Sequence, residues 1–222
     1  MSAAPALLDP PKPIGAGVVD AASFAALTQA TPAQMADLER LHGMLADWNG
    51  RLNLVSAASL AAFWPRHALD SAQLRGLAPA ARIWVDMGAG AGFPGLVLAI
   101  LLKGEPGAKV HLIESVAKKC HFLEAVVAAL ALPAEVHNER AENLSLKADV
   151  VTARAVAPLL RLLGFARPYL ARGASGLFPK GRGAEAEIAE ARKVWRFTCN
   201  VIPSRSDPEG RILKVEGLAR AR

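Results

Sequence analysis

The sequence predicts an α/β protein whose sheet is mostly parallel, with an antiparallel C-terminal hairpin and an N-terminal helical extension. Three observations predict this class. Short β-rich segments alternate with helical segments after residue 79, the earlier part of the chain has helical periodicity, and the last two β-rich runs flank a Pro/Ser/Asp/Gly connector. Because parallel strands need crossover helices, helices should cover both faces of the sheet. We expect a flexible tail over residues 1–30, a helical extension over 31–78 and the sheet domain over 79–222.

The helical extension begins with a strong start signal. Thr31 is an expected N-cap, Pro32 occupies the first helical position, and Gln34 completes a capping box. An amphipathic face follows at spacings of three and four, formed by Met35, Leu38, Leu41, Leu45 and Trp48. This helix should end near residues 49–50, and a second helix is expected over residues 59–76.

The sheet domain is expected to alternate strands and helices in chain order. The predicted strands cover residues 82–86, 109–114, 134–138, 149–153, 176–179, 197–202 and 211–216. The predicted helices cover residues 94–102, a segment capped by Ser115 that continues to about residue 130, and residues 158–169 and 184–195.

Length and composition exclude several classes of protein. At 222 residues, the chain has the size of one domain with a small extension. No apolar run approaches the roughly 20 residues that a membrane span requires, and the N-terminus lacks the basic region of a signal peptide. The two cysteines, Cys120 and Cys199, form no CxxC pair and no disulfide framework. A reducing cytoplasm fits this cysteine usage.

The positive charge is concentrated in the C-terminal part of the chain. Residues 140–222 hold 16 Lys/Arg and 8 Asp/Glu, whereas residues 1–139 hold 10 and 12. This asymmetry indicates a polyanionic partner, although a solvated basic face without a partner is a nearly equal alternative.

A glycine cluster at residues 86–95 lies between a predicted strand and a predicted helix, where open α/β sheets bind ligands. Glycines let the backbone approach a ligand, and the helix start offers free N–H groups, although a tight turn needed only for packing is also possible. Leu96 and Val97 follow Gly95 in place of the Lys-Ser/Thr of a nucleoside triphosphate loop. Phe93 occupies a position where a dinucleotide fingerprint needs a small residue, which argues against NAD.

The next predicted strand ends in an acidic residue. Glu114 lies about 20 residues beyond Gly92, where a carboxylate can accept hydrogen bonds from ribose hydroxyls. Taken alone, Glu114 is also compatible with a solvent-facing strand end. Together with the glycine turn, it indicates a nucleoside ligand without a required diphosphate, which suits S-adenosylmethionine.

Several short blocks carry a resemblance that covers nearly the whole chain after about residue 30. They are Trp48-Asn49 with Asn53-Leu54, Arg66-His67 with Leu69-Asp70-Ser71, residues 86–95, Glu114-Ser115 with Lys118-Lys119 and Phe122-Leu123, Arg140-Ala141-Glu142, residues 154–158, and Lys180-Gly181. In this order the blocks resemble the RsmG (GidB) family of 16S rRNA guanine-N7 methyltransferases. Val55 and Pro179 depart from the family pattern, and Pro179 removes a backbone donor next to Lys180.

The resemblance implies a Rossmann-like S-adenosylmethionine-dependent methyltransferase fold and transfer of a methyl group to N7 of guanine 527 in 16S rRNA. It implies the small ribosomal subunit as partner, and we expect a cytoplasmic monomer without a membrane partner. The implied cofactor-binding residues are Gly88, Gly90, Phe93, Glu114, Ala141, Glu142 and Arg154.

No catalytic residue is assigned, because guanine N7 carries an exposed lone pair and needs positioning more than proton removal. The sequence has no G-x-S-x-G, no HExxH and no clustered Cys/His, so we expect no metal site. The substrate-side candidates are His67, Asp70 and Lys180, and the RNA-binding candidates are Arg66, Lys118, Lys119, Arg182 and Arg205. His67 and Asp70 share a helix face at i, i+3, where a hydrogen bond within the helix or a contact to the sheet domain is the alternative.

Two other functions remain open from the sequence. One is a methyltransferase that acts on a small molecule or a protein. The other is a non-catalytic nucleotide-binding module that associates with the ribosome, which would bind the cofactor without turnover.

Overall fold

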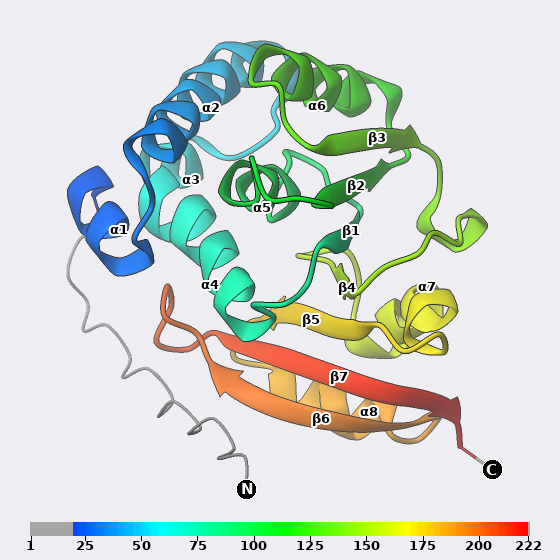
Figure 1. The fold of residues 1–222 in the computed structure, drawn as a ribbon. Coiled ribbons are helices and arrows are strands. Elements are labelled where there is room, and N and C mark those ends of the chain that lie inside the picture. The colour runs from blue at the N-terminus through cyan, green and yellow to red at the C-terminus, as the bar shows by residue number, and fades with distance from the viewer. Residues whose placement is uncertain (1–19, 222) are drawn as a thin grey trace, which may run out of the picture.

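The computed structural model describes residues 20–221, and these form a sheet of seven strands with helices on both faces (Figure 1). The strand order across the sheet is β3-β2-β1-β4-β5-β7-β6. The strands are β1 (Ile83–Met87), β2 (Lys109–Glu114), β3 (Ala134–Asn138), β4 (Val150–Thr152), β5 (Ser175–Lys180), β6 (Trp195–Pro203) and β7 (Arg211–Arg220). The first five strands pair in parallel, and β7 pairs antiparallel with β5 and β6. The predicted α/β class with a closing antiparallel hairpin is confirmed.

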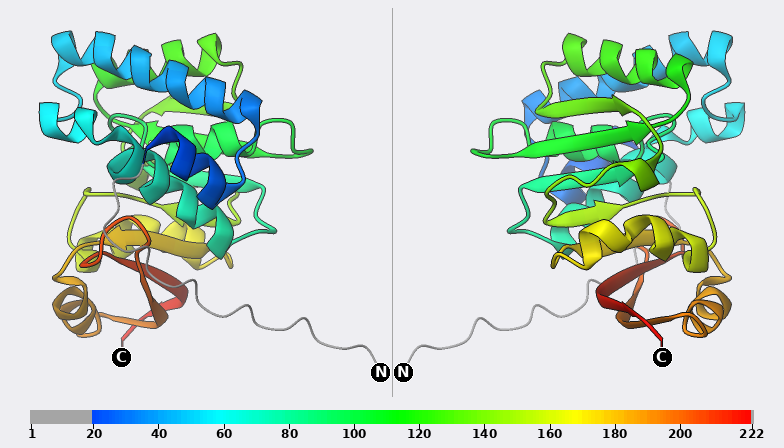
Figure 2. Two further views of the ribbon diagram at one scale, coloured as in Figure 1. Left: turned by 90° about the vertical axis from the view of Figure 1, so that its left-hand side faces the viewer. Right: turned by 90° about the vertical axis from the view of Figure 1, so that its right-hand side faces the viewer.

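The helices are α1 (Ala21–Thr28), α2 (Pro32–Leu52), α3 (Ala57–Ala61), α4 (Asp70–Leu77), α5 (Gly95–Leu101), α6 (Ala117–Ala129), α7 (Leu159–Leu170) and α8 (Ala184–Ala191), with the helical turns η1 (Trp64–Leu69) and η2 (Ala141–Asn143). The long helix α2 packs against α5 and α6 at one end of the molecule. The β6–β7 hairpin and α8 lie at the opposite end (Figure 2).

Alternation along the strands divides the core into two layers. Trp84, Val110 and Leu112 pack with the helices before and after β1, in the cluster that includes the N-terminal helices. Val85 and Ile113 point to the opposite face and pack in the cluster that contains α7 and α8. The N-terminal helices therefore share one continuous core with the sheet, while the predicted domain boundary at residues 78/79 stays a prediction.

The start of α2 confirms the predicted capping box. The Thr31 side chain accepts a hydrogen bond from the Gln34 backbone N–H at 3.2 Å, and the Gln34 side chain accepts one from the Thr31 N–H at 2.9 Å. The helix continues to Leu52, beyond the predicted end near residue 50, and Asn53 closes it in the left-handed conformation. Within residues 20–221, none of the helices combines the length and hydrophobicity of a membrane span.

The predicted flexible tail over residues 1–30 is too long at its C-terminal end. Residues 1–19 lie outside the described part of the chain, but residues 21–28 form α1. Asp20 and Ser23 form a capping box, and the buried ring of Phe24 lies 5.3 Å from that of Trp64. Burial of Phe24, together with the packing of Leu27 against the same core, holds α1 against the protein, and the short apolar segment does not reveal those contacts.

The prediction of one helix over residues 59–76 is also wrong, because the segment is broken into α3, η1 and α4. Pro65 lies at the start of η1, a turn with π-helical hydrogen bonding. A proline cannot donate the i→i−4 hydrogen bond and crowds the preceding turn, which favours an irregular turn at Pro65, although α7 continues past Pro168 near its end.

Two further helix boundaries differ from the prediction. Helix α6 begins after Val116 without the predicted side-chain cap from Ser115, and the Glu114 carboxylate accepts the Val116 N–H at 2.8 Å. Helix α8 ends at Ala191, and Trp195 starts β6 instead of ending the helix. The Trp195 ring is buried and its N–H donates to the Leu160 carbonyl, so tertiary packing overrides the helical pattern.

Candidate functional site

The main cavity opens at the carboxyl ends of β1, β4 and β5, beside the β6–β7 loop. Its volume is 1080 Å³, large enough for a nucleoside-sized ligand with room for part of a larger substrate. Of the predicted site residues, it brings together Gly88, Gly90, Phe93, Arg154, Arg66, His67, Asp70 and Lys180. Parallel strands end at one edge of the sheet, so residues far apart in the sequence meet there.

The glycine loop after β1 needs its glycines for two reasons. Gly88, Gly90 and Gly92 all have positive φ values, which side-chain-bearing residues rarely adopt. A Cβ at Gly88 would also lie 2.6 Å from a methyl carbon of Val156. At Gly88 and Gly90 the loop therefore presents backbone without a Cβ to the cavity wall.

Asp86, at the end of β1, binds the far end of this loop, where α5 begins. Its carboxylate accepts the N–H of Gly95 at 2.8 Å, and its other oxygen has no hydrogen-bond partner among the described residues. The residue is completely buried. Burial raises the pKa of Asp86 to about 7, against the opposing effects of the Gly95 hydrogen bond and the Arg154 charge.

Glu114, at the end of β2, binds the middle of the loop, at Gly90. Its carboxylate accepts hydrogen bonds from the backbone N–H of Gly90 at 3.0 Å and of Val116 at 2.8 Å. Its side chain is buried, so it reaches the glycine loop without lining the main cavity. Glu114 thus connects the ends of two neighbouring strands.

Arg154, which follows β4, is the centre of a polar network on the opposite side of the cavity. Its guanidinium donates to the Arg66 carbonyl at 2.7 Å, to the Asp70 carboxylate at 3.2 Å and to His67 Nδ1 at 2.9 Å. It also lies 5.4 Å from the centre of the Phe93 ring. The predicted pair His67 and Asp70 therefore contacts the sheet domain, as the alternative interpretation proposed.

His67 is held in its neutral form. Since Arg154 can only donate, His67 Nδ1 must accept, which leaves Nε2 to donate to the Ser59 hydroxyl at 2.7 Å. Burial first, and then the charges of Arg154 and Arg66, lower the pKa of His67 to about 3. Its ring stacks on Phe93 with centroids 4.3 Å apart. Phe93, which argued against a dinucleotide fingerprint, thus joins the glycine loop to the N-terminal helices.

The same network continues into the β6–β7 loop. The second oxygen of Asp70 accepts from the Ser206 hydroxyl at 2.7 Å and from the Gln73 amide at 3.1 Å. The Gln73 side chain also accepts the backbone N–H of Arg205 at 2.8 Å. Asp70 and Gln73 therefore fix a loop that forms part of the cavity rim.

Lys180 lines the cavity despite the preceding proline. Pro179 lies in β5 opposite Ile212 of β7, and Lys180 pairs with Arg211. The Lys180 ammonium donates to the Ala157 carbonyl at 2.8 Å and forms an ion pair with Glu187 at 2.8 Å. This lysine is consequently anchored at the base of the segment that follows Arg154.

The remaining predicted residues lie away from the cavity lining. Ala141 and Glu142 form η2, which packs against α7, and Glu142 is exposed. The RNA-binding candidates outside the lining are distributed over three elements. Lys118 and Lys119 lie in the first turn of α6, Arg182 forms an exposed ion pair with Glu209, and Arg205 is half-buried in the β6–β7 loop.

Sequence reasoning did not select Asp86, Gln73 or Ser206 as parts of the site. The signal for Asp86 was present, because an acidic residue directly before a glycine turn ends a buried strand. Nothing local distinguishes Gln73 or Ser206, since the hydrogen bonds that join α4 to the β6–β7 loop connect residues more than 130 positions apart.

Solved structures with a similar fold include methyltransferases. The structure of the mitomycin 7-O-methyltransferase MmcR matches with a TM-score of 0.57 and 16% identity, over 90% of this chain and 72% of that one. A variant of MtNAS in complex with S-adenosylmethionine matches with a TM-score of 0.52 and 16% identity, over 90% of this chain and 85% of that one. At these identities the similarity concerns the fold.

Sequence relatives are much closer. Ribosomal RNA small subunit methyltransferase G of Caulobacter vibrioides (strain NA1000 / CB15N) is 58% identical, over 92% of this chain and 95% of the relative. The protein of the same name from Parvibaculum lavamentivorans is 48% identical, over 92% of each chain. The GidB family model, described as rRNA small subunit methyltransferase G, matches residues 34–206. The chain therefore belongs to the GidB family of rRNA small subunit methyltransferases.

Proposed function

We propose that this protein transfers a methyl group from S-adenosylmethionine to N7 of guanine 527 in 16S rRNA of the small ribosomal subunit. Membership of the GidB family establishes the class of enzyme, an rRNA methyltransferase. The observation that carries the proposed chemistry is the bare glycine loop between β1 and α5, held by Asp86 and Glu114 beside a large cavity.

The residues at the strand ends fit this cofactor. Gly88 and Gly90 present a backbone surface without Cβ atoms, as close approach of an adenosyl group requires. Glu114 is buried beside the cavity and does not line it, but a carboxylate has about four lone-pair sites and Glu114 uses two for backbone N–H groups, so two remain for ribose hydroxyls of a ligand seated on the Gly90 turn. One oxygen of Asp86 has no partner among the described residues, and burial raises the pKa of this carboxyl to about 7, so a ligand that carries a positive sulfonium close to the loop would favour its ionised form.

When bound, S-adenosylmethionine supplies a methyl group on a positively charged sulfur. Transfer of this methyl to guanine N7 would leave the methyl–sulfur electron pair on sulfur and pass the positive charge to the guanine. Guanine N7 offers a free lone pair, so no residue must remove a proton. The chain must instead orient the base and exclude water, for which Phe93 and the Arg154 network form a rigid wall of the cavity.

The distribution of positive charge around the cavity supports an RNA substrate. Arg66 and Lys180 line it, and Arg205 lies in the loop at its rim. Lys118, Lys119 and Arg182 extend the candidate RNA surface beyond it. Because several of these cations already have partners, we propose docking on the small subunit that depends on shape as well as charge, by a cytoplasmic monomer.

The decisive test maps modified guanosines in 16S rRNA from cells with and without this gene. We expect loss of a single N7-methylguanosine, at position 527, and its restoration by the wild-type gene. An unchanged pattern contradicts the proposal. With purified protein and labelled cofactor, incorporation into a metabolite or a protein instead of small subunits or rRNA would indicate the other substrates, and binding without turnover would indicate the non-catalytic module.

The cofactor site is tested separately by calorimetric titration of S-adenosylmethionine. Glu114→Ala should weaken binding by about 1.5–3 kcal/mol, because ribose hydroxyls lose a charged acceptor and the Gly90 loop loses its anchor. Glu124→Ala, which removes an exposed glutamate from α6, is the matched control and should bind as the wild type does. Equal affinity in the two variants would remove Glu114 from the site.

A further inference from the structure

A cluster of potential metal ligands lies on the sheet, outside the main cavity. His111 comes from β2, and Glu135 and His137 come from the edge strand β3. Among the described residues, this is the one group of three His/Cys/Asp/Glu side chains whose donor atoms all lie within 4.8 Å of one another. The sequence, from which we expect no metal site, gives no sign of this cluster, because the two strands assemble it from residues that no sequence motif connects.

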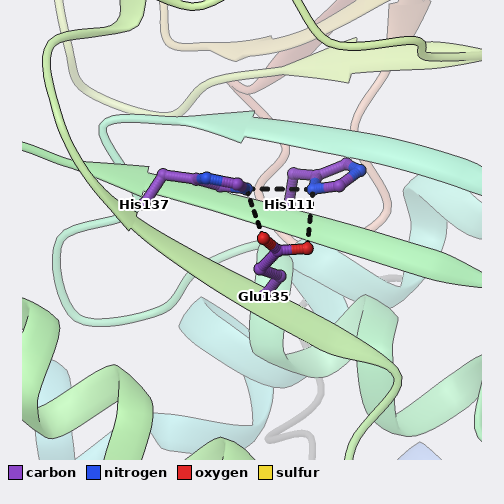
Figure 3. Close-up of side chains that lie close together, drawn as sticks. All are labelled: His111, Glu135 and His137. Carbon is purple, nitrogen blue, oxygen red and sulfur yellow. Dashed lines mark hydrogen bonds and ion pairs between the residues drawn. The ribbon is translucent and has the colours of Figure 1, made fainter.

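The strand register explains the cluster. His111 lies opposite Glu135, and Ile113 lies opposite His137 in the parallel pairing of β2 with β3. Residues two apart on a strand share a face, so all three polar side chains lie on the face to which Ile113 contributes. Figure 3 shows the two imidazole rings pointing toward each other, with the Glu135 carboxylate lying against both.

The distances are those of a site that a small cation can close. His111 Nδ1 and His137 Nε2 are 3.0 Å apart, and the Glu135 oxygens lie 3.9 and 4.0 Å from these two nitrogens. Donors about 2.1 Å from one ion at angles of 90–109° are separated by roughly 3.0–3.4 Å. The two nitrogens already meet this condition, and Glu135, whose side chain is half exposed, can cover the remaining distance if its ion pair with Lys109 is shared or broken.

We propose that His111, Glu135 and His137 bind a late first-row divalent metal ion of the Zn²⁺ class. Two imidazoles and one carboxylate suit Zn²⁺, Ni²⁺ and Cu²⁺ and disfavour Mg²⁺, which prefers oxygen ligands. Binding requires lone pairs on both facing nitrogens. The ring that donates the present His–His hydrogen bond must therefore carry its proton on its other nitrogen, a tautomer change without net proton loss.

Lys109 is the competing cation at this site. Its ammonium lies 3.0 Å from Glu135 Oε2, and it precedes His111 by two positions on the same face of β2. A bound metal must share the Glu135 carboxylate with Lys109 or displace it. The proposal therefore predicts that removal of this lysine tightens metal binding, which a purely structural His–His hydrogen bond does not predict.

The site does not depend on the proposed methyl transfer, and none of its residues lines the main cavity. It lies close behind one strand end of the cofactor region, because Glu114 follows His111 by three residues, about 10 Å along β2. An ion here would cross-link β2 and β3. It should raise the unfolding temperature by binding the native state alone.

The test is a calorimetric titration of tag-free, chelator-treated full-length protein with ZnCl₂, NiCl₂ and MgCl₂. We expect one equivalent of Zn²⁺ or Ni²⁺ to bind, a rise in unfolding temperature with Zn²⁺, and no binding of Mg²⁺. His137→Gln should weaken Zn²⁺ binding at least about tenfold, and Glu135→Gln by a smaller factor. Lys109→Met should tighten it several-fold. His121→Gln removes an exposed histidine from α6 and should change nothing.

Three results would overturn the proposal. The first is absence of Zn²⁺ binding by the wild type up to millimolar metal, which would leave the cluster as a hydrogen bond between two strands. The second is equal affinity in the wild type and in the two ligand variants, His137→Gln and Glu135→Gln. The third is loss of binding in Cys199→Ser but not in His137→Gln, which would place the ion on a thiol.

Discussion

The two sides of the main cavity are built in different ways. On the loop side, Asp86 and Glu114 hold backbone N–H groups of the glycine loop, at sequence separations of 9 and 24 residues. On the network side, Arg154 holds Asp70 across 84 positions, and Ser206 holds Asp70 across 136. The loop side is made of backbone and short-range contacts, and the network side is made of side chains from three distant segments.

This difference separates two kinds of specificity. A cofactor common to many enzymes can be held by a backbone cradle, which depends on a few glycines and one acid at each strand end. The surface facing the substrate is assembled from η1, the segment after β4 and the β6–β7 loop. A substitution in one of these segments can therefore change this surface without changing the glycine loop. We expect substitutions on the loop side to act through packing and those on the network side through lost polar partners.

The largest effect is expected on the loop side, from Gly95→Ala. A Cβ at Gly95 would lie 2.2 Å from a methyl carbon of Leu112 and 2.7 Å from the Asp86 carboxylate, both buried in the core. We expect a loss of about 3 kcal/mol or more of unfolding free energy. Gly43→Ala is the control, since Gly43 lies exposed within α2 with open space around it. It should stabilise the protein by about 0.5–1 kcal/mol in the same urea titration.

The second prediction concerns pH. The pKa of Asp86 is about 7 in the folded protein and near 3.8 when unfolded, so the native carboxyl holds its proton longer. Its contribution to stability falls as the pH rises from about 4 to about 7. Asp86→Asn cannot ionise and so lacks this pH-dependent loss. The unfolding free energy of the variant minus that of the wild type should therefore rise by on the order of 3 kcal/mol between pH 4 and pH 8.

Asp86→Asn must be compared with the wild type at each pH, because His67 changes the unfolding free energy with pH in the opposite direction to Asp86. Its pKa is about 3 when folded and near 6.5 when unfolded, so its contribution to stability rises with pH over that window. Urea unfolding of both proteins at several pH values cancels the His67 contribution. A constant difference between Asp86→Asn and wild type would show that Asp86 ionises normally.

On the network side, Arg154→Met should cost about 1–3 kcal/mol of unfolding free energy, because Asp70, His67 and the Arg66 carbonyl lose their shared donor. It should also raise the pKa of His67, which the Arg154 charge lowers, as NMR titration of the imidazole can measure. Arg182→Met breaks a solvent-exposed ion pair with Glu209 and should leave both quantities nearly unchanged. Similar losses in both variants would contradict a central role for Arg154.

The smallest effect is expected from Ser206→Ala, which removes one of the hydrogen bonds to Asp70. Since the Gln73 amide still donates to the same Asp70 oxygen, the loss should be about 0.5–1.5 kcal/mol. Ser145→Ala, at an exposed serine, should be neutral in the same thermal and urea unfolding measurements. Faster hydrogen exchange confined to the β6–β7 loop would locate the effect. Uniformly faster exchange would indicate a global loss instead.

Local sequence patterns were sufficient for much of the fold. The alternation of apolar residues predicted the two strands that carry His111 and His137 with the observed bounds, and the Thr31–Gln34 capping box predicted the start of α2. They failed where the outcome depends on a remote partner. Phe24 holds α1 to the core by packing beside remote residues such as Trp64, and Trp195 leaves the helical pattern because it packs beside Leu160.

The sequence by itself determined the family, the α/β class and the glycine loop with Glu114 at the neighbouring strand end, because these depend on short-range patterns and on the common edge of parallel strands. Only the tertiary structure decided that His67 and Asp70 accept hydrogen bonds from Arg154, and that two histidines and a glutamate meet on β2 and β3. Contacts between segments depend on strand order and register, and a side chain carries no local signal of its distant partner.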